Sequence, residues 1–187
     1  MKSLQRQPHR GKVIWLTGLP GSGKSSIAYA AADAMLGLAY ETVVLDGDML
    51  RLGLNSDLGY SIADRNENVR RTAEVAKLFF ETGKLVFVAL VSPVREARDK
   101  ARQLFPGTDF LEIHCNCDVS VCRRRDPKGH YAKAASGQIA EFTGVSSPYE
   151  APLDPELVLH TSSETMEESA ALLCKFLLGR LDVLVPS

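Results

Sequence analysis

Residues 18–25, GLPGSGKS, constrain the fold of this chain more than any other segment, and they match the pattern G-x-x-x-x-G-K-[ST]. An apolar run at 13–17 precedes them and predicts a buried strand, and the alanine-rich segment 25–38 has helical spacing. A strand, a glycine-rich turn and a helix in this order form the phosphate-binding loop (P-loop) of nucleotide-binding proteins. The sequence therefore predicts a P-loop α/β fold.

The residue types of this loop suit a polyphosphate ligand. Its glycines would let backbone N–H groups come close to an anion that also faces the amino end of the following helix. Lys24 is expected to reach the β- and γ-phosphates of ATP, and Ser25 to hold Mg²⁺. A glycine-rich turn without a ligand is the alternative that we disfavour. The residues predicted here to bind ATP are Gly18, Leu19, Pro20, Gly21, Ser22, Gly23, Lys24, Ser25 and Ser26.

Apolar strand-like runs alternate with helical patterns along the rest of the chain. We expect further strands at 41–45, 85–91, 109–114 and 157–160, and further helices at 64–82, 96–104, 119–125 and 164–178. Strands that are apolar on both faces and alternate with helices predict a three-layer α/β/α sandwich with a five-stranded, mainly parallel sheet. Right-handed crossovers would bring the carboxyl ends of the strands to one edge, where ligands bind.

The length of 187 residues fits one domain, which we place at 12–180. We expect a disordered basic tail at 1–11 and a short carboxyl-terminal tail at 181–187. The segment 126–151 is rich in turn formers and lysines and breaks the alternation. A flap (lid) over the site is the interpretation that we prefer there, with a plain surface loop as the alternative.

Composition argues against several classes of protein. With 22 basic and 23 acidic residues the net charge is −1, so no overall field attracts nucleic acid or an anionic membrane. No apolar run approaches the roughly 18 residues of a membrane span. The basic amino terminus lacks the apolar core of a secretory signal, so we expect a cytoplasmic protein. The cysteines Cys115, Cys117, Cys122 and Cys174 lack zinc-site spacing, which favours buried free thiols.

The loop motif alone does not distinguish a GTPase, an ATPase motor and a kinase. The sequence has no N-K-x-D-type guanine-reading element and no apolar strand that ends in Asp-Glu. Asp46 and Asp48 instead follow the second predicted strand, where a carboxylate can orient or deprotonate an acceptor hydroxyl and help to fix the metal. This combination favours a kinase that phosphorylates a small molecule.

Residues suited to a second, separately charged ligand come next along the chain. Arg51 and Arg65 are cations within reach of that strand end. Tyr60 offers a ring on which a base could stack, and Asn68 can donate and accept at a base or sugar edge. The alternative for these charges is a solvated helix face, which we prefer for the pair at 70–71.

At this point the sequence resembles the adenylyl-sulfate (APS) kinase family. Residues 45–71 match its run L-D-G-D-N-x-R-x-G-L-N-x-D-L-G-F-S-x-x-D-R-x-E-N-x-R-R, with Met49 in place of Asn and Tyr60 in place of Phe. Further similar segments are 92–93 (SP), 125–129 (RDPKG), 141–144 (EFTG) and 148–152 (PYEAP). The resemblance implies transfer of the ATP γ-phosphate to the 3′-hydroxyl of APS, with Mg²⁺, to give 3′-phospho-APS for sulfate assimilation.

The resemblance also implies roles for single residues. Asp46 matches the candidate base for the 3′-hydroxyl, Asp48 lies close to the metal held by Ser25, and Arg125 resembles the arginine that covers the ATP adenine. Ser92 matches a serine described in the family as a phosphoserine intermediate, with acceptor binding as the simpler alternative. The implied catalytic residues are Lys24, Asp46 and Ser92. The implied acceptor-binding residues are Asp46, Asp48, Arg51, Tyr60, Arg65, Asn68, Val91, Ser92, Lys128, Lys133 and Phe142.

Departures from the family pattern keep other acceptors open. Met49 removes an amide, and Val94 stands where an aromatic residue is common. A related kinase for another nucleotide conjugate, such as a cytidine diphosphoramidate, is the first alternative. A non-catalytic nucleotide-binding module is the second, although Lys24, Ser25 and Asp46 are intact. The resemblance is compatible with a homodimer and with a functional association with an ATP sulfurylase, and it implies no nucleic-acid or membrane partner.

Overall fold

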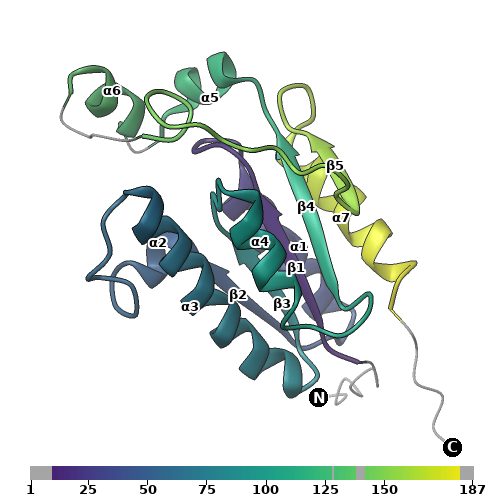
Figure 1. Ribbon diagram of the computed structural model, residues 1–187. Coiled ribbons are helices and arrows are strands. Elements are labelled where there is room, and N and C mark those ends of the chain that lie inside the picture. Colours follow the sequence, from purple (N-terminus) through teal and green to yellow (C-terminus); the bar gives the residue numbers. More distant parts are fainter. Residues whose placement is uncertain (1–9, 128, 138–141, 182–187) are drawn as a thin grey trace, which may run out of the picture.

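The computed structural model describes residues 10–127, 129–137 and 142–181 (Figure 1). Its five strands lie in the order β2-β3-β1-β4-β5, and every neighbouring pair is parallel. The strands are β1 (Lys12–Thr17), β2 (Thr42–Asp46), β3 (Leu85–Ala89), β4 (Phe110–Asn116) and β5 (Leu157–His160). The helices are α1 (Lys24–Gly37), α2 (Gly47–Leu50), α3 (Ile62–Glu81), α4 (Arg95–Arg102), α5 (Val119–Arg125), α6 (His130–Ala135) and α7 (Met166–Leu178).

Helices cover both faces of the sheet, as the continuous apolar strands predict. Ile14 and Leu16 of β1 pack into the cluster that includes side chains of α1 and α7. Val13 and Trp15, which alternate with them, pack into the cluster that includes side chains of α3 and α4. Figure 1 shows these two helix pairs on opposite sides of the sheet. The predicted three-layer α/β/α sandwich is confirmed, and the sheet is parallel throughout.

The register of the sheet brings three chain segments together at one edge. Asp46, the last residue of β2, pairs with Ala89, the last residue of β3. Leu16 of β1 pairs with the same Ala89, so the turn after Thr17 begins beside these two strand ends. Because each buried Val, Leu or Phe side chain contributes about 1.5–3 kcal/mol, the core holds this edge firmly in place. The P-loop and the acidic strand end therefore lie at the same edge of the sheet, on either side of the end of β3.

The observed elements differ from the predicted ones in two ways. β3 ends at Ala89 rather than at Val91, because Ser92 has a left-handed backbone (φ 37°) that leaves the sheet. Two short helices were not predicted, since four residues in α2 and six in α6 are too few for a periodic signal. Among the described helices, none has the length and apolar character needed to cross a membrane.

The predicted boundaries shift slightly at both ends. Gly11 is buried and Arg10 Nε lies 2.8 Å from Asp109 Oδ2, so both belong to the folded part rather than to the predicted tail. Leu181 packs in the core beside α7 and also lies inside the fold. Residues 1–9 and 182–187 of the two predicted tails lie outside the described residues.

The predicted flap, 126–151, lies against the P-loop. Its helix α6 places Tyr131, whose hydroxyl donates to Pro20 O at 2.9 Å. Phe142 packs edge-on against Tyr131 with ring centroids 5.0 Å apart. Residues 128 and 138–141 of this segment, and with them the predicted Lys128, lie outside the described residues.

Candidate active site

The P-loop has the open conformation that its glycines allow. Gly21 has φ 78°, and a Cβ there would lie 3.0 Å from Cys122 O. A Cβ on Gly18 would lie 2.6 Å from Cys115 O, so a side chain has no room at either position. Gly23 precedes α1 in a left-handed conformation and supplies no side-chain cap. The amino end of α1 is thus suited to receive an anion.

Lys24 lies folded across this loop. Its Nζ donates to Gly18 O at 3.0 Å, to Leu19 O at 2.7 Å and to Ser22 Oγ at 3.4 Å. Its side chain is largely buried, with 7% exposed. The ammonium group of Lys24 is therefore already in place for a phosphate. A bound phosphate would replace the carbonyl oxygens as its partner and form a charge-assisted hydrogen bond with it.

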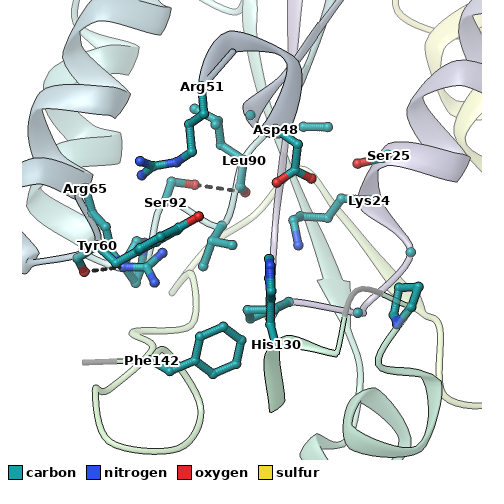
Figure 2. A pocket seen from close by; sticks show the side chains of 18 of the residues that line it. Lys24, Ser25, Asp48, Arg51, Tyr60, Arg65, Leu90, Ser92, His130 and Phe142 are labelled. Carbon is teal, nitrogen blue, oxygen red and sulfur yellow. Dashed lines mark hydrogen bonds between the residues drawn. The ribbon is translucent and has the colours of Figure 1, made fainter. Parts of the chain in front are cut away.

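A cavity of about 530 Å³ extends from the P-loop to the predicted acceptor residues. In Figure 2 the Asp48 carboxylate, the Lys24 ammonium and the Ser25 hydroxyl are directed toward the same part of it. The predicted site residues that line the cavity are Pro20, Gly21, Gly23, Lys24, Ser25, Ser26, Asp48, Arg51, Tyr60, Arg65, Asn68, Val91, Ser92, Arg125 and Phe142. Those described but not lining it are Gly18, Leu19, Ser22, Asp46 and Lys133.

Two arginines and two aromatic rings form the far wall of this cavity. Arg51 Nη1 donates to Leu58 O at 2.8 Å, and its Cζ lies 4.5 Å from the centre of the Tyr60 ring. Arg65 Nε donates to Tyr60 O at 3.0 Å, and its Cζ lies 5.4 Å from the same ring. Figure 2 shows Phe142 on the same side of the cavity. Two guanidinium groups beside the exposed Tyr60 ring, with the largely buried Phe142 also lining the cavity, suit an anion that carries a base.

Asn68 lines the same cavity from α3 and is oriented by a residue that the sequence analysis missed. Its Oδ1 accepts from Asn55 Nδ2 at 2.6 Å, and Asn55 is fully buried. The amide NH₂ of Asn68 is then the group suited to donate to a ligand. The signal for Asn55 was present in the matched run at 45–71, but nothing in the sequence alone showed which residue it contacts.

The two acidic residues after β2 have different positions. Asp46 Oδ1 accepts from Asp48 N at 2.8 Å and from Met49 N at 3.3 Å, and so caps α2. Asp46 is only 6% exposed and does not line the cavity, whereas Asp48 does. Asp48 is thus the carboxylate on the cavity wall, and Asp46 is the buried residue that caps the helix carrying Asp48.

Ser92 contributes backbone rather than an accessible hydroxyl to the wall. The residue is 3% exposed, and its Oγ accepts from Trp15 Nε1 at 3.1 Å and lies 3.0 Å from Thr17 Oγ1. Its carbonyl oxygen accepts from Arg98 Nη1 at 2.7 Å. The hydroxyl is therefore occupied with the core beneath the site.

A second cavity, of about 350 Å³, adjoins the P-loop on its other side. Arg125 lines both cavities, and its Nη2 donates to Thr161 O at 2.6 Å. The residues here that the sequence analysis missed are Ile27 of α1 and, after β5, Thr161, Glu164, Thr165, Met166 and Ser169. The residues after β5 carry no nucleotide-binding motif, and their only signal for a site is their place after β5, at the same edge of the sheet. The cavity next to Arg125 suits the base of a nucleotide whose phosphates lie in the P-loop.

Two buried thiols lie close to the phosphate side. Burial raises the pKa of Cys115 to about 12 and that of Cys122 to about 12. Both thiols are therefore uncharged at neutral pH and add no negative charge beside the P-loop. The prediction of buried free thiols holds for these two and for Cys117, while Cys174 is partly exposed.

The comparisons with known proteins agree with this geometry. A family model described as adenylylsulphate kinase matches residues 10–160. The adenylyl-sulfate kinase of Geotalea uraniireducens is 52% identical over 171 residues, covering 91% of this chain and 82% of the relative. That of Bacillus velezensis is 50% identical over 177 residues, covering 95% and 90%.

Among solved structures, the Mycobacterium tuberculosis APS kinase CysC in complex with AMPPNP and APS is similar with a TM-score of 0.87. It is 46% identical, and the match covers 91% of this chain and 99% of that one. From the family model and from relatives at about half identity over most of their length, we conclude that this chain belongs to the adenylylsulphate kinase family.

Proposed function

We propose that the protein transfers the γ-phosphate of ATP to the 3′-hydroxyl of APS, giving ADP and 3′-phospho-APS. One observation carries the proposal: a single cavity joins the P-loop to Arg51, Arg65, Tyr60 and Phe142. Two charged nucleotides can meet there with the acceptor hydroxyl facing the terminal phosphate. The product is the activated sulfate used in sulfate assimilation.

On the ATP side, the residues bind and neutralise. When ATP binds, Lys24 Nζ donates to the β- and γ-phosphate oxygens instead of to the carbonyl oxygens of Gly18 and Leu19. The amino end of α1 faces the negative charge of the same phosphates. Arg125, held by Thr161 O, covers the adenine next to the second cavity. The Ser25 hydroxyl and the Asp48 carboxylate are hard oxygen donors that fit Mg²⁺. Mg²⁺ bound there would offset the charge on the phosphate oxygens.

On the acceptor side, the residues orient. Arg51 and Arg65 bind the phosphosulfate, the rings of Tyr60 and Phe142 hold the adenine, and the Asn68 amide donates to the nucleotide. This places the sugar between the aromatic wall and the P-loop. Phosphoryl transfer then depends on aligning the acceptor hydroxyl with the γ-phosphate and on neutralising the phosphate charge. It does not require a covalent intermediate on the protein.

The proton of the acceptor hydroxyl goes to a carboxylate after β2. Asp46 remains our candidate base, with Oδ1 held by the cap of α2 and Oδ2 as the accepting atom. Asp48 lines the cavity from α2 and would hold the metal. For Ser92 we propose acceptor-wall positioning and no phosphoserine step, because its hydroxyl is bonded to Trp15 in the core.

The sequence departures that favour another acceptor lie away from the cavity wall. Met49 is 61% exposed and is not among the lining residues. Val94 packs against the core cluster beneath α4. Neither substitution therefore changes the surface that the acceptor would contact, which supports APS over a different nucleotide conjugate.

A substrate panel tests the proposal directly. The purified protein is given ATP, Mg²⁺ and either APS or a cytidine diphosphoramidate, and ADP release is measured. We expect ADP release with APS as the acceptor and no ADP release with the cytidine compound. The Lys24→Ala variant should release no ADP with either acceptor. ADP release only with the cytidine compound would show that APS is not the acceptor. Full activity of the Lys24→Ala variant would refute the role of the P-loop in binding ATP.

Several finer expectations stay predictions. Lys133 is exposed on α6 and is not among the residues that line the cavity, so its predicted contact with the acceptor requires a movement of the flap. A homodimer, an association with an ATP sulfurylase and a cytoplasmic location remain expectations from the sequence.

A further inference from the structure

Arg98 is a buried cation to which the proposed chemistry gives no task. It lies on α4 and is 1% exposed. All three of its guanidinium nitrogens donate hydrogen bonds: Nε to Glu112 Oε1 at 2.5 Å, Nη1 to Ser92 O at 2.7 Å and Nη2 to Glu150 O at 2.8 Å. One guanidinium group therefore joins β4, the turn after β3 and the last part of the flap.

The ion pair alone does not explain this arrangement. Glu112 needs a cation because a buried carboxylate without a partner is strongly destabilising. One edge of the guanidinium group meets that need. The two remaining nitrogens bind backbone carbonyls from two separate chain segments, and a rigid planar fork fixes the distance between the segments that it bridges.

The first of these carbonyls belongs to the acceptor wall. Ser92 lines the large cavity and holds a left-handed backbone with φ 37°, which is unfavourable for a residue with a side chain. A charge-assisted bond to its carbonyl oxygen stabilises this conformation. Arg98 thus holds the turn that brings Val91 and Ser92 into the cavity.

The second carbonyl belongs to the return of the flap. Glu150 N donates to Pro93 O at 2.9 Å, and Glu150 Oε2 accepts from Arg95 N at 2.7 Å. Just before it, Tyr149 OH and Thr17 Oγ1 hydrogen-bond at 3.0 Å. The flap segment that begins at Phe142 is therefore tied, at its far end, to the same turn that carries Ser92.

We propose that Arg98 is a positioning residue for the acceptor, which fixes the Ser92 wall and the return of the Phe142-bearing flap relative to each other. The inference rests on the proposed function. Its hydrogen bonds reach neither the P-loop nor the second cavity. Loss of the fork should therefore weaken acceptor binding and leave ATP binding nearly unchanged.

The test compares Arg98→Lys with a matched control on the same helix, Arg102→Lys. Lysine keeps the positive charge beside Glu112 but cannot bind three acceptors as a planar fork. Arg102 also pairs with acidic side chains, its Nη1 2.7 Å from the partly buried Glu156 Oε1 and its Nη2 3.6 Å from the buried Glu112 Oε2. Its bonds reach neither Ser92 nor Glu150. We expect the KM for APS to rise on the order of 10-fold in Arg98→Lys, and both KM values to stay within about twofold in Arg102→Lys.

A second readout needs no substrate. Hydrogen exchange of residues 143–151, and of the Glu150 amide in particular, should become faster on the order of 10-fold in Arg98→Lys and stay unchanged in Arg102→Lys. A wild-type protein that is inactive on APS would refute the proposed function. The exchange measurement would still show whether Arg98 holds the segment around Glu150 in place. Unchanged exchange, or equal changes of the KM for ATP and for APS, would overturn the role of Arg98.

Discussion

Replacing Asp46 by asparagine separates its two tasks, because only the charge is lost. In the structure Asp46 Oδ1 accepts from Asp48 N and Met49 N, and an asparagine oxygen can accept the same two bonds. Asp46→Asn should therefore keep α2 in place and fold with unchanged stability. Asp46→Ala removes the cap as well, which costs about 1 kcal/mol.

These two variants give different expected values. A loss of about 1 kcal/mol lowers the melting temperature of a chain of this size by roughly 2–4 °C, so Asp46→Ala should show that shift and Asp46→Asn should not. If the carboxylate takes the proton from the acceptor, both variants should lose about 10²-fold or more in kcat. Calorimetry and steady-state ADP release with APS measure the two effects separately.

Two outcomes would refute this reasoning. An Asp46→Asn variant with normal kcat and only a raised KM for APS would make Asp46 a binding residue. An Asp46→Ala variant with the melting temperature of the wild type would show that the cap of α2 contributes nothing.

The remaining predictions concern the acceptor ring, the wall serine and pH. Tyr60→Phe should keep the KM for APS within about twofold, while Tyr60→Ala should raise it on the order of 10-fold, because stacking needs the ring and not the hydroxyl; equal effects of the two changes would contradict stacking. Ser92→Ala should keep kcat within about threefold but lower the free energy of unfolding by about 1–3 kcal/mol, since the buried Trp15 Nε1 loses its acceptor; a 10²-fold loss of kcat at normal stability would instead support a phosphoserine step. Burial, with Arg98 and His160 nearby, lowers the pKa of His114 below its ordinary 6.5. The unfolded chain then binds the proton more readily, so stability should be complete above about pH 6.5 and fall as the pH drops below it. Melting temperatures at several pH values should show a smaller fall for His114→Gln, and an equal fall would assign the effect to other groups.

Most of the fold follows from local patterns in the sequence. The apolar runs at 13–17 and 85–91 predict buried strands, which the structure has as β1 and, up to Ala89, as β3. The glycine-rich loop between the first strand and the first helix indicates where phosphate binds. Once the sheet is parallel, the carboxyl end of β2 has to lie at the same edge as the P-loop, and the structure places β3 between β2 and β1. The placement of Asp46 and Asp48 near the cavity follows from the same reasoning.

What the sequence could not predict depends on contacts between distant segments. The four residues of α2 have no periodicity, so the cap that separates Asp46 from Asp48 is visible only in three dimensions. Thr161 joins the site because β5 happens to end beside Arg125. Arg98 belongs to a highly charged helix, a composition that is typical of an exposed surface. Only the structure shows that Arg98 is buried and paired with Glu112.

A crystal structure of the protein with a non-hydrolysable ATP analogue, Mg²⁺ and APS bound together tests the central claim most directly. We expect the triphosphate in the loop of residues 18–25, the APS adenine between Tyr60 and Phe142, and its 3′-hydroxyl directed at the γ-phosphorus. A phosphosulfate far from Arg51 and Arg65, or a P-loop without phosphate, would contradict the proposed transfer.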